Sequence, residues 1–144
     1  MDNFLIQLSE NILLKARLGE DTSMLRRELH YLKDKKLESF LYNDELKSIF
    51  WCNIYNGFVL IMAKENSKTI SIFKYKRIKI AHSILSLDDI EYKILRMNNY
   101  KPLHKYIYYL FSPRFIKNAA IKKGDSKFIS SLDRTPLYTS HSVN

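Results

Sequence analysis

Several residue types are scarce in this sequence, and each shortage excludes a class of protein. A single cysteine, Cys52, excludes an internal disulfide and favours a reducing compartment. Three prolines and three glycines in 144 residues are too few for a collagen-like or low-complexity chain. Ten tyrosines and eight phenylalanines argue against wholesale disorder, so we expect a folded protein with a hydrophobic core.

Long hydrophobic segments are also missing. The longest apolar run without tyrosine is Phe58–Ala63, far shorter than the roughly 20 residues of a membrane-spanning helix. The first residues, Met1-Asp2-Asn3, are acidic, and polar residues interrupt the apolar stretch that follows, which is unlike a secretory signal. We therefore expect a soluble cytoplasmic protein with no membrane partner.

Acidic residues become rare in the second half of the chain. Residues 1–67 contain nine Lys/Arg against ten Asp/Glu, which gives a net charge of −1. Residues 68–144 contain fifteen Lys/Arg against five Asp/Glu, which gives +10. This asymmetry indicates that one part of the protein meets a polyanion and the other has a different role.

Two amphipathic helices are predicted in residues 1–43. Segment 3–18 has apolar residues at helical spacing, and Gly19 can end it in a left-handed conformation. A second helix runs to about residue 41, and its N-cap candidates are Asp21, Thr22 and Ser23. This helical hairpin is expected to mediate self-association or dock a partner protein, or else to fold back over the sheet.

A small antiparallel sheet is predicted in the middle of the chain. Segments 49–55 and 58–63 are rich in aromatic and β-branched residues, and Asn56-Gly57 between them is a strong hairpin signal. Two further strands are indicated by alternating patterns at 69–73 and 77–80. We thus expect three or four strands.

Helical signals return at Asp88. Three short helices are predicted at 88–97, 103–111 and 114–123, the last with Ser112-Pro113 at its start. A hairpin at 127–138 and a frayed tail at 140–144 follow. The expected class is α+β, with a helical hairpin at 1–43 and a second domain at 44–139.

The order of strands, three helices and a hairpin is that of a winged helix. The stretch Leu87-Asp88-Asp89-Ile90-Glu91-Tyr92-Lys93-Ile94-Leu95 resembles the first helix of OmpR/PhoB-type DNA-binding domains. Asp125-Ser126-Lys127-Phe128-Ile129 with Tyr138 is similar to the wing of that family. The resemblance covers about residues 57–139 and implies a winged helix-turn-helix that binds DNA.

The resemblance implies that residues 113–123 form a recognition helix. Arg and Asn side chains on it would contact base edges, and Lys would contact phosphates. The nucleic-acid-binding residues expected on this basis are Lys101, Lys105, Arg114, Lys117, Asn118, Lys122, Lys123 and Lys127. The first hypothesis is therefore a DNA-binding transcriptional regulator, with the N-terminal helices binding a second copy or a protein partner.

Two alternatives remain open at this point. The basic half could bind an acidic protein, which would make the chain a non-enzymatic adaptor, inhibitor or chaperone-like accessory. Glu91-Tyr92-Lys93 with Asp88 and Asp89 upstream also has the Glu-x-Lys spacing of metal-dependent nucleases. Adjacent Asp residues at a helix start are more often caps, so the nuclease is the weaker hypothesis.

Other residues that can carry chemistry do not form a recognisable site. No two of the four histidines stand at the spacing of a helical zinc site: His30, His82, His104 and His141. Cys52 in an apolar run is expected to be a buried small hydrophobe. The tyrosines at 100–109 could stack bases, but at helical spacing they are more typical of a helix core and edge. We expect no catalytic residue, metal or cofactor.

Overall fold

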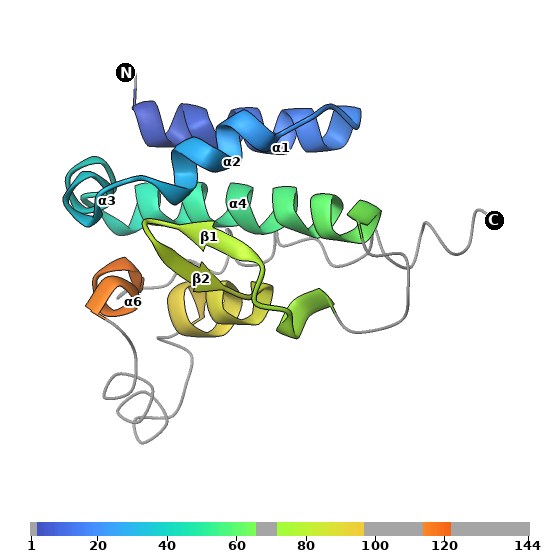
Figure 1. Cartoon of the computed structure of the whole chain (residues 1–144). Coiled ribbons are helices and arrows are strands. Elements are labelled where there is room, and N and C mark those ends of the chain that lie inside the picture. Colours follow the sequence, from blue (N-terminus) through green and yellow to red (C-terminus); the bar gives the residue numbers. More distant parts are fainter. Residues whose placement is uncertain (1–2, 66–71, 97–113, 122–144) are drawn as a thin grey trace.

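The computed structural model describes residues 3–65, 72–96 and 114–121 (Figure 1). Helices α1 (Phe4–Leu18), α2 (Ser23–His30), α3 (Asp34–Phe40) and α4 (Asp44–Glu65) precede the 3-10 turn η1 (Ile72–Lys74), strands β1 (Ile78–Ile80) and β2 (Ser83–Leu85), the π-helix η2 (Asp89–Leu95) and helix α6 (Arg114–Ala119). N-terminal helices followed by a small antiparallel sheet confirm the predicted α+β class.

Helix α4 runs through the centre of the molecule, with α1 along one side and the hairpin and η2 on the other (Figure 1). The predicted strands at 49–55 and 58–63 are therefore wrong, because both segments lie in α4. Its start is capped by Asn43, whose side-chain oxygen accepts a hydrogen bond from the Leu46 N–H at 2.8 Å. A helix buried on several faces has no apolar stripe, so its sequence lacks helical periodicity.

Gly57 is a packing site and not a turn. A Cβ atom at this position would lie 3.3 Å from Ile12 Cγ2 and 3.4 Å from the Leu13 Cα, both tight contacts. Glycine therefore lets the backbones of α1 and α4 approach closely. The Asn56-Gly57 pair, which predicted a hairpin, instead marks where the two helices meet.

The prediction of α1 is confirmed at both ends. Asn3 accepts hydrogen bonds from the N–H groups of Leu5 and Ile6 at 3.0 and 3.2 Å. Gly19 ends the helix with φ 72°, as a left-handed cap residue. One hydrophobic cluster runs from Leu5 to Ile121, so α1 shares its core with the later elements.

The predicted second helix is divided into α2 and α3. To continue past His30, the helix would need the carbonyls of Leu29 and His30 to accept from residues 33 and 34. These carbonyls instead accept from the N–H groups of Ala81 and His82, at 3.0 and 2.8 Å. A contact from a distant turn thus ends α2, and no local sequence signal announces it.

The antiparallel hairpin pairs Ile78 with Leu85, Lys79 with Ile84 and Ile80 with Ser83. It confirms the predicted strand at 77–80, with Ile78 and Ile80 buried and Lys79 exposed. The predicted strand at 69–73 is wrong in its described part, since residues 72–74 form a 3-10 turn, and the rest lies outside the described residues. The structure describes two strands where three or four were predicted.

The helix predicted from Asp88 is present, but most of it has π-helical bonding. Ser86 and Asp89 form a reciprocal cap: the Asp89 carboxylate accepts from the Ser86 N–H at 2.9 Å, and the Ser86 hydroxyl accepts from the Asp89 N–H at 3.0 Å. Helix α6 confirms the start of the predicted helix at 114–123, but it ends at Ala119, because the next two residues are described and are not helical. The predicted helix at 103–111, hairpin at 127–138 and tail at 140–144 lie outside the described residues.

Helix α4 has the length and composition of a membrane-spanning helix, although its longest unbroken apolar run is short. Of its most apolar window, 61% is buried inside the protein. Such burial is typical of the core helix of a soluble protein.

Candidate functional site

Helix α6 carries three of the eight residues predicted to bind nucleic acid. Its Phe115 packs on Trp51 of α4, with ring centroids 6.0 Å apart. The Asn118 amide donates to Glu38 Oε1 of α3 at 2.7 Å, so this side chain already has an acidic partner. The structure does not describe the side chains of Arg114 and Lys117. The other five predicted residues lie outside the described ranges: Lys101, Lys105, Lys122, Lys123 and Lys127.

Asp89 belongs to the Glu-x-Lys pattern that suggested a nuclease, and it is buried. Burial raises the pKa of this carboxyl, but hydrogen bonds from Lys76 and the Ser86 N–H and the charge of Lys93 outweigh burial and lower it below the ordinary 3.8. Its oxygens lie 2.8 Å from Lys76 Nζ and 3.3 Å from Lys93 Nζ. The carboxylate thus ties η2 to the segment before β1.

Glu91 is also buried, and it joins η2 to α4. Its Oε1 accepts from the Tyr55 hydroxyl at 3.1 Å, and its Oε2 accepts from Arg96 Nε at 2.8 Å. Within the described ranges, no group of three or more His, Cys, Asp or Glu side chains could hold a metal ion. The two carboxylates therefore act in the structure as internal anchors, and the nuclease stays an untested hypothesis.

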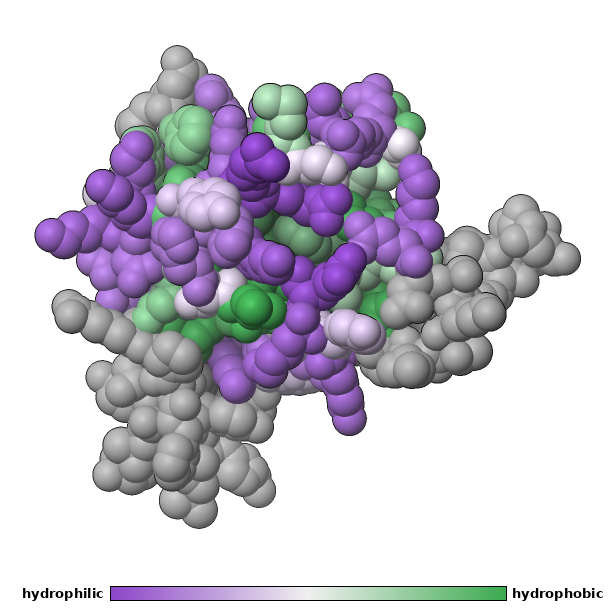
Figure 2. Space-filling view, in the orientation of Figure 1, coloured by the Kyte–Doolittle hydropathy of each residue, from purple (hydrophilic) through white to green (hydrophobic). Residues whose placement is uncertain are grey.

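A hollow of about 320 Å³ lies between α2 and the hairpin, and we call it the basic hollow. The residues that line it are Ser23, Arg26, Arg27, His30, Tyr31, Phe58, Arg77 and Lys79. Four of them are cationic at neutral pH, and none is acidic. Figure 2 shows that mainly hydrophilic side chains cover this face of the molecule.

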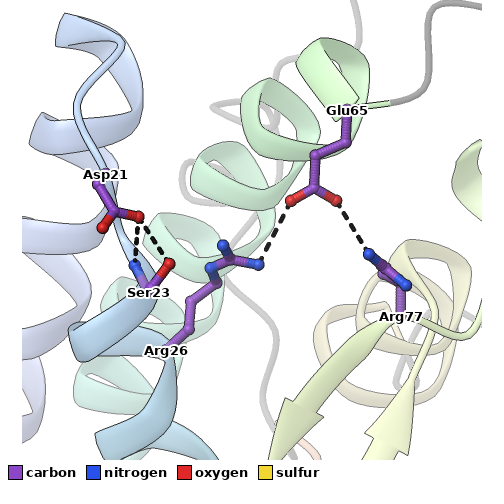
Figure 3. A network of polar contacts seen from close by, with 5 residues as sticks. All are labelled: Asp21, Ser23, Arg26, Glu65 and Arg77. Carbon is purple, nitrogen blue, oxygen red and sulfur yellow. Dashed lines mark hydrogen bonds and ion pairs between the residues drawn. The ribbon is translucent and has the colours of Figure 1, made fainter.

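Glu65, at the end of α4, organises one side of the basic hollow (Figure 3). Its two carboxylate oxygens each lie 3.5 Å from an arginine, Oε1 from Arg26 of α2 and Oε2 from Arg77 before β1. Nearby, Asp21 accepts from the Ser23 hydroxyl at 2.6 Å and from its N–H at 3.0 Å. The hydroxyl bond, and after it the N–H bond, lowers the pKa of Asp21. These contacts fix the start of α2.

Two of the four cations of the basic hollow can pair with an incoming anion. In the part of the chain that the structure describes, Arg27 and Lys79 form no ion pair. Both side chains are exposed. An anion entering the hollow would meet these two charges without first displacing a protein carboxylate.

Sequence reasoning missed this site because its residues come from both halves of the chain. Arg26 and Arg27 belong to the half with a net charge of −1, where nothing marked them as special. A local signal did exist later, in the run Lys74-Tyr75-Lys76-Arg77-Ile78-Lys79, which has four cations in six residues. Only the fold places this run beside α2.

Two histidines that are far apart in the sequence also meet at this site. The ring centroids of His30 and His82 lie 5.7 Å apart, and Tyr31 contacts both rings. Sequence spacing had suggested no histidine pair. Cys52, by contrast, is buried in α4 as predicted.

Comparison with known families corrects the winged-helix resemblance. A family model described as "Protein of unknown function, DUF547" matches residues 39–133, more than half of the chain. The match covers most of residues 57–139, and the first part of that stretch is helix α4 and not the sheet a winged helix needs. Neither the curated proteins nor the solved structures include a significant match. The chain therefore belongs to the family described as DUF547.

Proposed function

We propose that this protein binds nucleic acid through the basic hollow, without catalysing a reaction. The observation that carries the proposal is the convergence of four Arg and Lys side chains on one hollow, where Glu65 pairs with Arg26 and Arg77 while Arg27 and Lys79 form no ion pair within the described ranges. Nucleic acid binds such surfaces because each phosphate contact releases counterions. A single, buried cysteine is typical of a protein in the reducing cytoplasm, and such a regulator would meet nucleic acid there.

A polymer fits this surface better than a small anion. The basic run continues beyond the hollow to the exposed Lys74, and Lys76 beside it is 62% exposed although it contacts Asp89. Arginine guanidinium groups bind phosphate in a bidentate manner, and Arg26, Arg27 and Arg77 are all at this site. Several cations in and around one hollow are the pattern expected for contact with successive phosphates.

The first prediction concerns Arg27 and Lys79, which form no ion pair with the residues that the structure describes. We expect Arg27→Ala with Lys79→Ala to weaken nucleic-acid binding. The slope of log K against log salt should fall by about 1.4–1.8, since each lost phosphate contact contributes about 0.7–0.9. Fluorescence anisotropy of a labelled oligonucleotide at several salt concentrations measures both effects.

Lys35→Ala with Lys36→Ala is the matched control, because it removes two exposed positive charges from α3, outside the hollow. An equal loss of binding in both double variants would show that only net charge matters and would overturn the proposed site. Lys117→Ala with Lys122→Ala tests the residues predicted from the sequence in the same titration. An acidic protein that co-purifies and resists nuclease treatment would favour the adaptor or inhibitor hypothesis instead.

A further inference from the structure

Three aromatic rings gather at the rim of the basic hollow, where α2 ends. The ring centroids of His30 and Tyr31 lie 4.6 Å apart. The His82 ring, from the β1–β2 turn, lies 5.7 Å from His30 and 5.6 Å from Tyr31. Tyr31 is 61% exposed and His82 is exposed, so this ring cluster presents aromatic surface to solvent.

The backbone holds the ring cluster in place. Ala81 and His82 have positive φ angles of 49° and 65°, which residues other than glycine adopt only at a cost in free energy. Their N–H groups donate to the last carbonyls of α2, from Leu29 and His30. The turn and the helix end therefore form one rigid support for the three rings, and the two-residue hairpin between Ile80 and Ser83 accounts for the positive φ angles.

Cations lie directly beside the rings. His30 and Tyr31 line the basic hollow together with Arg27 and Lys79. A strand with its phosphates in the hollow would carry its bases past the rim where the rings lie. Charged groups for phosphates and rings for bases are the two components of known single-strand binding surfaces.

We infer that the ring cluster stacks the bases of a single-stranded nucleic acid whose phosphates occupy the basic hollow. This inference rests on the proposed function and adds the class of strand. In a duplex, each base is stacked on its neighbours, so a protein ring has no base face to contact. An acidic protein would pair with the cations, but it has no flat base faces to stack on the exposed rings of Tyr31 and His82.

An abasic strand tests the inference, since it has the phosphates of an oligothymidylate and lacks the bases. We expect the protein to bind labelled oligothymidylate more tightly than an abasic strand of equal length, and more tightly than a duplex. Tyr31→Ala should weaken oligothymidylate binding roughly tenfold, the usual effect of removing one stacking ring, and should leave abasic binding unchanged. Tyr31→Phe keeps the ring and should bind like the parent protein.

The outcomes separate the two proposals. Equal binding of the oligothymidylate and abasic strands, or a Tyr31→Ala variant that weakens both alike, would overturn the stacking inference and leave the proposed function standing. Absence of binding to any nucleic acid at low salt would overturn both. Because Tyr31 is exposed, the variants should fold, and circular dichroism with thermal unfolding checks this before the titrations.

Discussion

The buried carboxylate of Asp89 stabilises the fold through its charged contacts with two lysines. We expect Asp89→Asn to lower the free energy of unfolding by about 1.5 kcal/mol at neutral pH, because the contacts with Lys76 and Lys93 lose their charge. The amide oxygen can still accept from the Ser86 N–H, so the cap of η2 should survive. Urea unfolding of both proteins measures the difference.

The pH dependence of this difference follows from the lowered pKa of Asp89. The folded-state pKa lies below the ordinary 3.8, so the charged carboxylate stabilises the fold fully above that value. As the pH falls through the folded-state pKa, the carboxylate takes up a proton and its contribution is lost. The difference in the free energy of unfolding between the parent protein and Asp89→Asn should therefore narrow only below about pH 3.8.

Asp34→Asn, at an exposed position in the first turn of α3, provides the comparison. Its effect on stability should stay below about 0.5 kcal/mol at every pH. A gap for Asp89→Asn that stays constant down to strongly acidic pH would contradict the assignment of Asp89 as a charged anchor.

At the scale of elements, the β1–β2 turn combines strain with the ring cluster. We expect His82→Gly to raise the free energy of unfolding by about 0.5–1 kcal/mol, because glycine adopts φ 65° without steric cost. The same change removes one ring from the cluster, so oligothymidylate binding should weaken. Higher stability together with weaker binding would show that His82 costs the turn some stability and that its ring contributes to binding.

Ser83→Gly is the control for this prediction, since Ser83 lies in the same hairpin and is not among the residues with positive φ. There glycine should lower stability by about 0.5–1 kcal/mol. If both substitutions destabilise the protein alike, the turn is not strained in the way we describe.

The elements also show where sequence reasoning holds and where it fails. Helix α1 has a polar face and a Gly end, and both were predicted from the sequence, whereas its Asn3 cap was identified only in the structure. Helix α4 is enclosed by other elements, so its aromatic and β-branched residues resembled strands and Gly57 resembled a turn. The break between α2 and α3 depends on hydrogen bonds from a turn about fifty residues later, beyond any local pattern.

At the scale of the whole molecule, the candidate site exists only after folding. The charge asymmetry drew attention to basic residues in the second half of the chain, whereas the described cations that converge come from α2 and from the segment at β1. Net charge per segment gives only the excess of cations over anions, whereas a site needs its cations on one face. The site could not be read from the sequence, because α2 belongs to the half in which acids and bases balance.

Glu65 connects these two parts of the molecule and also limits what the basic hollow can bind. Its carboxylate lies between Arg26 and Arg77, where it neutralises part of the charge that a phosphate would meet. We expect Glu65→Gln to raise nucleic-acid affinity about threefold, the effect of one unit charge roughly 6 Å from a phosphate at a hydrated surface. Stability should fall by less than about 1 kcal/mol, since the ion pairs are partly exposed.

Glu10→Gln makes the same charge change at an exposed position on α1, outside the hollow, and should alter affinity far less. Salt titrations of both variants separate a local effect from a change in net charge, because a local effect persists at salt concentrations that screen distant charges. Weaker binding by Glu65→Gln would contradict the competition described here. It would mean that Glu65 acts mainly by holding the two arginines in position, so that the anion-binding geometry depends on a carboxylate at the end of the central helix.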